Sequence, residues 1–377
     1  MNMEYFDYCA GLTMTNDRFA ALFDGPARRP ESALTRREMD LACSLQTVTE
    51  EIMLRMARHV HAETVEKNLV MAGGVALNCV GNGRILREGP FEKVWIQPAA
   101  GDAGGAVGAA LFAWHTYLGH ERRSPEGKDA MHGSYLGPEF TDDAIEQFLK
   151  MKQVPYRKLS REKLLEEVSH LIAQENVIGW FQGRMEFGPR ALGARSILGD
   201  ARSPKMQSIM NLKIKFRESF RPFAPSVLRE RVTEYFQLDC ASPYMLLVAP
   251  VAESRRLPLT GGQEKLSGLE RLTLPRSDIP AVTHVDYSAR IQTVDRDDHP
   301  LYYDLIGEFA KKTGYAVMIN TSFNVRGEPI VCRPEEAYTC FMRTQMDYLT
   351  MGSFLLSKRE QKELDDTPEE KRGFELD

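Results

Sequence analysis

Long apolar runs and an excess of charge of one sign are both missing from this sequence. No window of the 377 residues approaches the roughly 20 apolar residues that a membrane-spanning helix needs, and the first residues lack the pattern of a secretory leader. The formal net charge is −5, so no basic field favours nucleic acid as a partner. We therefore expect a cytoplasmic globular protein that binds neither membranes nor nucleic acid.

Familiar catalytic and metal-binding motifs are also missing. The six cysteines form no CxxC pair, which indicates reduced thiols rather than a disulfide framework or a zinc site. The eight histidines show no HExxH spacing, and there is no Walker-A lysine motif, no GxGxxG turn and no legible Ser–His–Asp arrangement. Any chemistry must therefore come from other local groups of residues.

A segment in which arginine alternates with glycine, residues 183–198, is the strongest functional signal. Arg184, Arg190 and Arg195 are interleaved with glycines, and Ser196 follows directly. Arginine forks suit bidentate pairing with phosphate or carboxylate, and glycines allow backbone N–H groups to approach the same oxygens. The segment therefore predicts an anion-binding loop at the end of a strand. A solvated basic turn is the alternative.

Basic residues alternate with apolar ones in residues 213–225. Lys213, Lys215, Arg217 and Arg221 all fall on odd positions, so on a strand they would share one face. A half-buried strand with a wholly basic face needs an anion to offset its charge, and we expect the arginine loop to share that anion. The alternative is an exposed edge strand that its charges protect from pairing.

Small hydroxyl and amide side chains gather in a further segment, residues 319–329. Asn320, Ser322 and Asn324 lie at the end of an expected strand and offer neutral donors for phosphate oxygens. A simple polar turn is the alternative.

Two glycine turns follow short strands in the N-terminal third. Residues 68–118 alternate between strand, glycine turn and helix, which is typical of an α/β layer. Gly73, Gly74 and Asn78 follow the first strand, where paired glycines let a nucleotide approach the backbone, although a tight turn is the alternative. Asp102 follows the second strand among small residues. It suits a metal or a polar ligand, or else serves as a helix N-cap.

The chain divides into two units of mixed α/β structure. Polar residues 121–133 make the best linker between them, and residues 252–276 predict a long surface excursion. In the second unit we expect a buried strand at 177–181 and a helix that begins at Pro334. The small apolar residues 106–118 predict a closely packed helix.

These segments, in this order and at this spacing, resemble the O-carbamoyltransferases that tailor nodulation factors and antibiotics, over about residues 4–358. The resemblance implies that residues 1–122 form the C-terminal part of an actin/hexokinase-like ATPase-fold domain. It further implies a linker at 123–133, a YrdC-like α/β domain at 134–360 and a charged tail at 361–377.

The resemblance also implies a reaction in two steps. The YrdC-like domain would condense carbamoyl phosphate with ATP, in the presence of magnesium, to give carbamoyl-adenylate and pyrophosphate. The ATPase-fold domain would then pass the carbamoyl group to a hydroxyl of a small-molecule or glycan acceptor at a divalent metal, iron, once the rest of that domain is supplied. The alternative is a non-catalytic nucleotide-binding subunit that a separate N-terminal half or partner chain would complete. Binding of double-stranded RNA is a third and weaker possibility.

Carried over by position, the resemblance assigns residues to several groups. The catalytic group, which would neutralise charge during adenylate formation, is Arg190, Arg195, Lys215, Arg217 and Arg221. Carbamoyl phosphate and ATP would be bound by Ser196, Asn320, Ser322 and Asn324, the adenylate by Gly73, Gly74 and Asn78, and the metal by Asp102. Two features depart from the family. The resemblance implies a further segment with metal-binding histidines, which would precede the residue numbered Met1, and Tyr287 stands where a glycine is expected.

Overall fold

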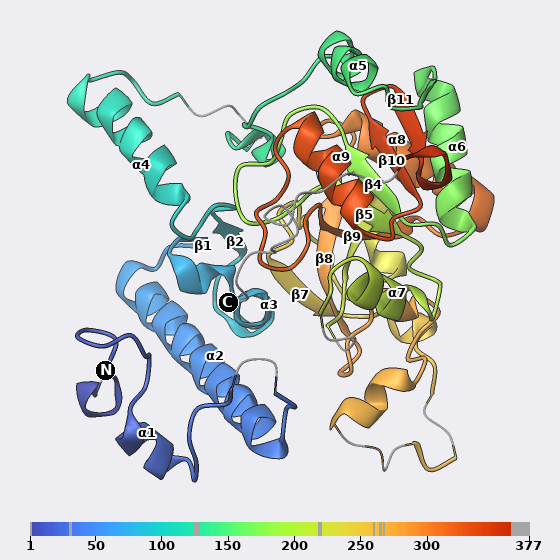
Figure 1. Cartoon of the computed structure of the whole chain (residues 1–377). Helices are drawn as coiled ribbons and strands as arrows, with labels where there is room; N and C mark the ends of the chain where they lie inside the picture. Colours follow the sequence, from blue (N-terminus) through green and yellow to red (C-terminus); the bar gives the residue numbers. More distant parts are fainter. Residues whose placement is uncertain are drawn as a thin grey trace.

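Residues 2–29, 32–123, 129–217, 221–258, 261–263, 266 and 268–362 are described by the computed structural model. They form a large mixed sheet flanked by helices and a smaller α/β layer from the N-terminal third (Figure 1). The expected α/β class is therefore confirmed. Among the described residues, no helix combines the length and the apolar character needed to cross a bilayer.

The N-terminal layer contains the expected alternation of strand, glycine turn and helix. Its two short strands are parallel, with Asn68 opposite Lys93. Helix α2 starts at a capping box made by Thr35 and Glu38, and it packs on α3 around a small core that includes Leu54. The elements are α1 (Asp17–Leu22), α2 (Arg36–Thr64), β1 (Asn68–Met71), α3 (Cys79–Glu88), β2 (Lys93–Ile96) and α4 (Gly104–Phe112).

Much of the apolar surface of this layer is uncovered. No residue of α4 is buried, and Figure 1 shows this helix reaching away from the large sheet. Val70 on β1 is 72% exposed and Leu45 on α2 is 70% exposed. The close packing expected for residues 106–118 is therefore wrong, because nothing in the described part of the chain covers α4.

In the described residues, nine strands form the large sheet. Their order is β3-β11-β10-β4-β5-β9-β6-β8-β7, with parallel and antiparallel neighbours. The central strands β4, β5 and β6 are buried along their whole length, which confirms the buried strand expected at 177–181. The strands are β3 (Arg157–Lys158), β4 (Ile178–Phe181), β5 (Arg195–Gly199), β6 (Ala224–Leu228), β7 (Leu247–Pro250), β8 (Ser288–Val294), β9 (Val317–Ser322), β10 (Tyr348–Met351) and β11 (Phe354–Ser357).

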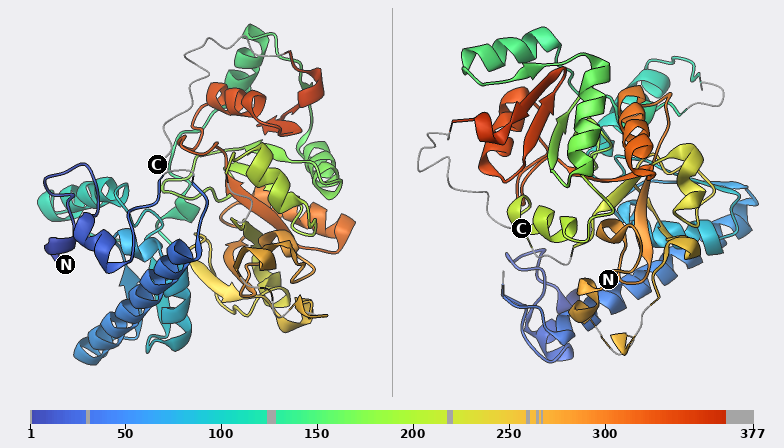
Figure 2. Two further views of the ribbon diagram at one scale, coloured as in Figure 1. Left: turned by 60° about the horizontal axis from the view of Figure 1, so that its bottom comes forward. Right: turned by 90° about the vertical axis from the view of Figure 1, so that its right-hand side faces the viewer.

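Helices cover both faces of this sheet. Helix α6 packs against α8 on one face, and α9 lies over β4 and β10 on the other (Figure 2). Pro300 and Pro334 occupy the first turns of α8 and α9, where a missing N–H costs nothing, and the helix expected at Pro334 is confirmed. The helices are α5 (Asp142–Met151), α6 (Arg161–Ala173), α7 (Met206–Lys213), α8 (Pro300–Thr313) and α9 (Pro334–Arg343).

Helix α3 fixes the N-terminal layer to strand β7. Asn82 donates from Nδ2 to the Leu246 carbonyl at 3.0 Å, and Arg87 donates to the Val248 carbonyl at 2.8 Å. A Cβ on Gly83 would lie 2.2 Å from the Val248 oxygen, so only glycine permits this close approach. The contact brings the start of α3 to the edge of the large sheet.

The expected linker ends in hydrogen bonds that join the two parts of the molecule. Asp129 accepts from the Trp95 indole at 2.9 Å and from the Tyr244 hydroxyl at 2.7 Å. The preceding linker residues 124–128 lie outside the described residues. The same holds for residues 218–220 of the expected basic strand, for parts of the excursion at 252–276, and for residues 363–377 of the expected tail.

Candidate functional site

The arginine–glycine segment forms the loop between β4 and β5, and Glu186 pins its backbone from within. The Oε1 atom of Glu186 accepts from the N–H groups of Leu192 at 2.6 Å and Ala194 at 2.7 Å. The N–H of Gly193, between them, donates to the Ser196 hydroxyl. This stretch of backbone is therefore occupied by the protein itself and does not offer its N–H groups to an external anion.

Gly193 lets the same loop close on helix α8. Its φ is +115°, and a Cβ there would lie 2.3 Å from the Tyr302 ring. Its carbonyl accepts from Trp180 Nε1 at 2.8 Å and from His299 Nε2 at 3.0 Å. These contacts fix the part of the loop that follows Arg190.

The three arginines of the loop lie in three different surroundings. Arg195 is fully buried, where it donates to backbone carbonyls and stacks 3.6 Å from the centroid of the Phe181 ring. Arg184 lies at the surface beside Glu139. Arg190 lines a cavity. The structure thus separates residues that the sequence placed in one group.

A cavity of about 410 Å³ lies between this loop, the ends of β6 and β9, and the start of α3. Its lining residues include four arginines and no aspartate or glutamate. The arginines are Arg190, Arg217, Arg221 and Arg290, and they are joined by Cys79, Val80, Phe223, His284, Asn320 and Ser322 among others. A concave surface with this excess of positive charge can bind a polyanion.

Arg190 lacks part of its hydrogen bonding in this cavity. Its Nε is buried without a partner in the described residues. Burial, and then the charge of Arg290, lowers the pKa of Arg190 to about 10. A bound anion would offset the charges of Arg190 and Arg290 and so favour the protonated form of Arg190.

Residues 213–221 do not form the expected basic strand. Helix α7 continues to Lys213, and β6 begins only after the segment. Lys213 is exposed, whereas Lys215 is buried at 3% exposure, so the basic side chains do not share a face. The predicted strand is wrong because a tertiary contact overrides the local alternation of basic and apolar residues. The Asn211 side chain, on α7, accepts from the Nε of Arg217 at 2.7 Å and folds the chain into a turn.

Lys215 is held against the end of β9. Its Nζ donates to the Ser322 carbonyl at 2.5 Å and to the Asn324 Oδ1 at 2.7 Å. Its hydrogen-bond partners in the described residues include no carboxylate, and burial, followed by the charge of Arg217, lowers its pKa to about 7. Lys215 therefore positions the segment that carries Ser322, which itself lines the cavity.

Sulfate should bind this cavity several-fold more weakly as the pH rises from about 6 to about 8.5. Lys215 loses its proton near pH 7 and with it a charge and a donor beside Ser322. His284, whose pKa burial lowers to about 4, stays neutral throughout. Isothermal titration with sulfate, whose own charge is constant in this range, measures the effect. In K215M the affinity should be lower and independent of pH, and a wild-type affinity that does not change with pH would contradict this role.

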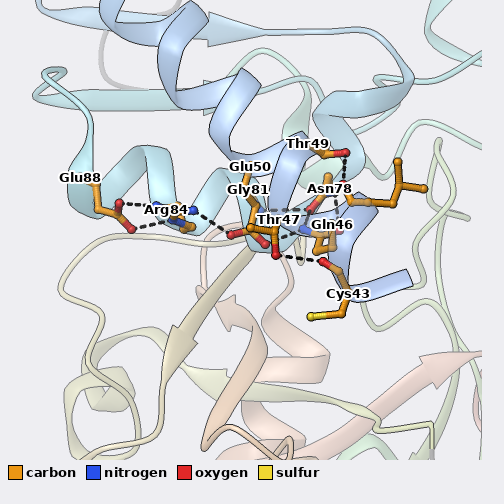
Figure 3. Close-up of polar contacts among 10 residues, drawn as sticks. Cys43, Gln46, Thr47, Thr49, Glu50, Asn78, Gly81, Arg84 and Glu88 are labelled. Carbon is orange, nitrogen blue, oxygen red and sulfur yellow. Dashed lines mark hydrogen bonds and ion pairs between the residues drawn. The ribbon is translucent and has the colours of Figure 1, made fainter. Parts of the chain in front are cut away.

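Asn78 caps helix α3 and is tied to helix α2. Its Oδ1 accepts from the Gly81 N–H at 3.0 Å, and its amide pairs with Gln46 in both directions at 3.0 and 3.1 Å (Figure 3). Figure 3 shows the contacts continuing through Glu50 to Arg84. The side chain predicted to bind adenylate is thus already engaged in holding the two helices together.

The predicted glycine turn lies next to the predicted metal segment. Gly73 has a φ of +99°, and a Cβ on Gly73 or Gly74 would meet nothing within 4 Å. The Gly73 N–H donates to the Ala100 carbonyl at 2.9 Å, which brings the Asp102 segment alongside. Helix α3 begins a few residues later, and its first two residues line the arginine cavity.

Asp102 is exposed, and the described residues contain no group of three acidic, histidine or cysteine side chains that could hold a metal. Ala103 occupies the N-cap position of α4 and makes no side-chain cap hydrogen bond, so the alternative of Asp102 as the N-cap is wrong. The described residues alone do not make up a metal site, and Asp102 as one ligand of a divalent metal stays a prediction.

Two family models match the chain over most of its length. One, described as Carbamoyltransferase C-terminus, matches residues 169–358, and the other, Carbamoyltransferase N-terminus, matches residues 1–111. The chain belongs to the carbamoyltransferase family. It is 60% identical to an uncharacterised protein of Synechocystis, with all of this chain and 62% of the relative covered. It is 41% identical to nodulation protein NolNO of Sinorhizobium fredii, with 88% of this chain and 46% of that protein covered.

This carbamoyltransferase-family chain thus spans 46% to 62% of the length of these two relatives. Nodulation protein NolO of Bradyrhizobium diazoefficiens is 37% identical, and the match covers 88% of this chain and 57% of that one. Among solved structures, HypF of T. kodakarensis aligns with a TM-score of 0.34 and 16% identity over 56% of this chain and 24% of its own.

His284 and Arg290 line the cavity of this carbamoyltransferase-family chain, although the sequence analysis did not select them. Tyr287 lies between them, at a position where a glycine is expected, and this was the signal in the sequence. Its φ of +62° is left-handed, a conformation that glycine adopts without strain, which explains the expectation. His284 Nδ1 lies 3.0 Å from the Ser288 hydroxyl, which donates to Asp286. Nδ1 must therefore donate, and the neutral ring keeps Nε2 as an acceptor.

Proposed function

We propose that the cavity binds carbamoyl phosphate together with ATP and forms carbamoyl-adenylate. The observation that carries this proposal is a lining of four arginines without any carboxylate. Both compounds are polyanions, and membership of the carbamoyltransferase family supports the carbamoyl group as the one activated. Arg190, Arg217, Arg221 and Arg290 would neutralise the charge that develops when the α-phosphate of ATP is attacked.

The proposed reaction balances in two changes of bonding. Water takes the phosphoryl group of carbamoyl phosphate, which releases phosphate and leaves carbamate. A carbamate oxygen then attacks the α-phosphorus of ATP, and pyrophosphate leaves with magnesium. Each carbamoyl-adenylate is therefore accompanied by one phosphate and one pyrophosphate, and both should accumulate together.

Other residues predicted for this site would act on it indirectly. Arg195 and Ser196 are fully buried and hold the arginine loop from inside. Lys215 and Asn324 hold the segment that follows β9. We assign these four residues to positioning the loop and Ser322 rather than to contact with the substrates.

The second step, transfer of the carbamoyl group to a hydroxyl of a small molecule or glycan, would use the N-terminal layer. Gly73 and Gly74 leave open space beside the start of α3, where the adenylate could approach. The exposed apolar faces of β1 and α4 favour a transfer domain completed by further polypeptide. The same faces favour the alternative of a nucleotide-binding subunit in a larger assembly.

Incubation of the chain with ATP, carbamoyl phosphate and magnesium tests the activation step. We expect pyrophosphate in a coupled assay and carbamoyl-adenylate by mass spectrometry, and neither when carbamoyl phosphate is omitted. The absence of both products from a folded sample would contradict the proposal. Activation without carbamoylation of any added hydroxyl compound would show that transfer needs the completing polypeptide.

A further inference from the structure

Asn320, near the end of β9, has its side-chain nitrogen engaged and its side-chain oxygen left as an acceptor. It is 1% exposed and lines the cavity. Its Nδ2 is already engaged, because it donates to the Ala191 carbonyl at 3.2 Å and to the Gln292 Oε1 at 2.8 Å. Its Oδ1 is buried without a partner in the described residues. The expectation that Asn320 donates to phosphate therefore does not fit these contacts.

The orientation of this amide is fixed by its neighbours. Gln292 donates from Nε2 to the Leu192 carbonyl at 2.7 Å, and its Oε1 accepts from the Ser226 hydroxyl at 2.6 Å. Backbone carbonyls can only accept, so neither amide can be turned around without setting two oxygens against each other. Gln292 thus positions Asn320 with its oxygen unpaired.

An unpaired buried oxygen beside a cationic cavity selects for a ligand with two chemical features. Arginine side chains require an anion, and the Asn320 oxygen requires an N–H or O–H donor. Sulfate, which is fully ionised at neutral pH, carries no such donor. Carbamoyl phosphate carries both features, because its carbonyl bears an NH2 group one atom away from the bridging oxygen.

We propose that Asn320 accepts a hydrogen bond from the carbamoyl NH2 group and so makes the cavity select carbamoyl phosphate over acyl phosphates of the same size. This inference rests on the proposed function and adds the determinant of its substrate choice. Acetyl phosphate has the same charge and shape but a methyl group in place of NH2. Its binding would leave the Asn320 oxygen buried and unpaired, which is unfavourable.

The adenine amino group of ATP is the other donor that could reach an acceptor in this protein. The position of Asn320 favours the carbamoyl group instead. Its amide bonds to Ala191, the residue next to Arg190, and its backbone pairs with Ala224, three residues after Arg221. The acceptor therefore lies beside the residues that would hold phosphate, whereas the adenine amino group is separated from the phosphates by a ribose.

Titration of the full chain with carbamoyl phosphate and with acetyl phosphate tests the proposal directly. We expect the wild-type protein to bind carbamoyl phosphate about tenfold more tightly than acetyl phosphate. In N320A this ratio should fall close to one while the affinity for sulfate stays unchanged. The control variant N176A removes a half-buried asparagine whose Nδ2 likewise donates to a backbone carbonyl, that of Leu171 at 3.0 Å, and it should keep the wild-type ratio.

The wild-type comparison decides the question even if N320A does not fold. Equal affinity of the wild-type protein for the two compounds would overturn the inference and leave the proposed function standing. No binding of carbamoyl phosphate at all would overturn both. A loss of ATP affinity in N320A with an unchanged ratio would assign the acceptor to adenine and overturn the inference as well.

Discussion

Replacing Arg190 with alanine should lower the rate of pyrophosphate formation by about 10²- to 10³-fold. Arg190 lines the cavity, where its guanidinium group can donate to a substrate phosphate. Its removal also takes away a buried cation, whose pKa is lowered by burial and then by the charge of Arg290, and the free energy of unfolding should therefore not decrease. Pyrophosphate release and urea denaturation measure the two effects separately.

Arg184 provides the matched control in the same loop. Its side chain is exposed and lies 3.5 Å from Glu139, and exposed ion pairs contribute little to stability. We expect R184A to keep nearly full activity and stability, and R190K to be intermediate, because lysine keeps the charge without the planar fork. Full activity in R190A, or an equal loss in R184A, would place the phosphate site elsewhere.

Elements with a strong local signal could be predicted from the sequence. The apolar run at 177–181, bounded by polar residues, became the buried strand β4, and Pro334 marked the start of α9. The segment 213–221 failed because its short alternation of basic and apolar residues fits either a strand or a helix end followed by a turn. A contact from Asn211 decided between them, and no local pattern encodes such a contact.

The candidate site shows the same limit on a larger scale. Residue type and spacing identified the segments that bring Arg190, Arg221 and Asn320 to one cavity. They could not show that Arg195 is buried and donates to backbone carbonyls, because the sequence pattern of such an arginine is the same as that of an arginine that binds phosphate. The supporting residue Gln292 acts only through contacts across the sheet, so it carried no signal.

Replacing Glu186 with alanine should lower the free energy of unfolding by about 3 kcal/mol. The carboxylate accepts from the N–H groups of Leu192 and Ala194, which both lie in buried residues. Without it, these donors are left unpaired, and each buried unpaired group costs about 1 to 3 kcal/mol. Urea denaturation of E186A measures the loss, and the surface variant E139A serves as a control that should change little.

The pH dependence of the free energy of unfolding distinguishes two contributions of Glu186, its negative charge and its role as a hydrogen-bond acceptor. Burial raises the pKa of Glu186 above its ordinary value of 4.5, so the folded state binds a proton more readily than the unfolded state. Its contribution to stability is therefore greatest below the ordinary carboxyl pKa and is lost as the pH rises through the folded value. E186Q keeps an acceptor oxygen for the loop, so it should lose much less stability than E186A and should lack this decline. If E186A were as stable as E139A, the loop that presents Arg190 would be held by something other than this carboxylate.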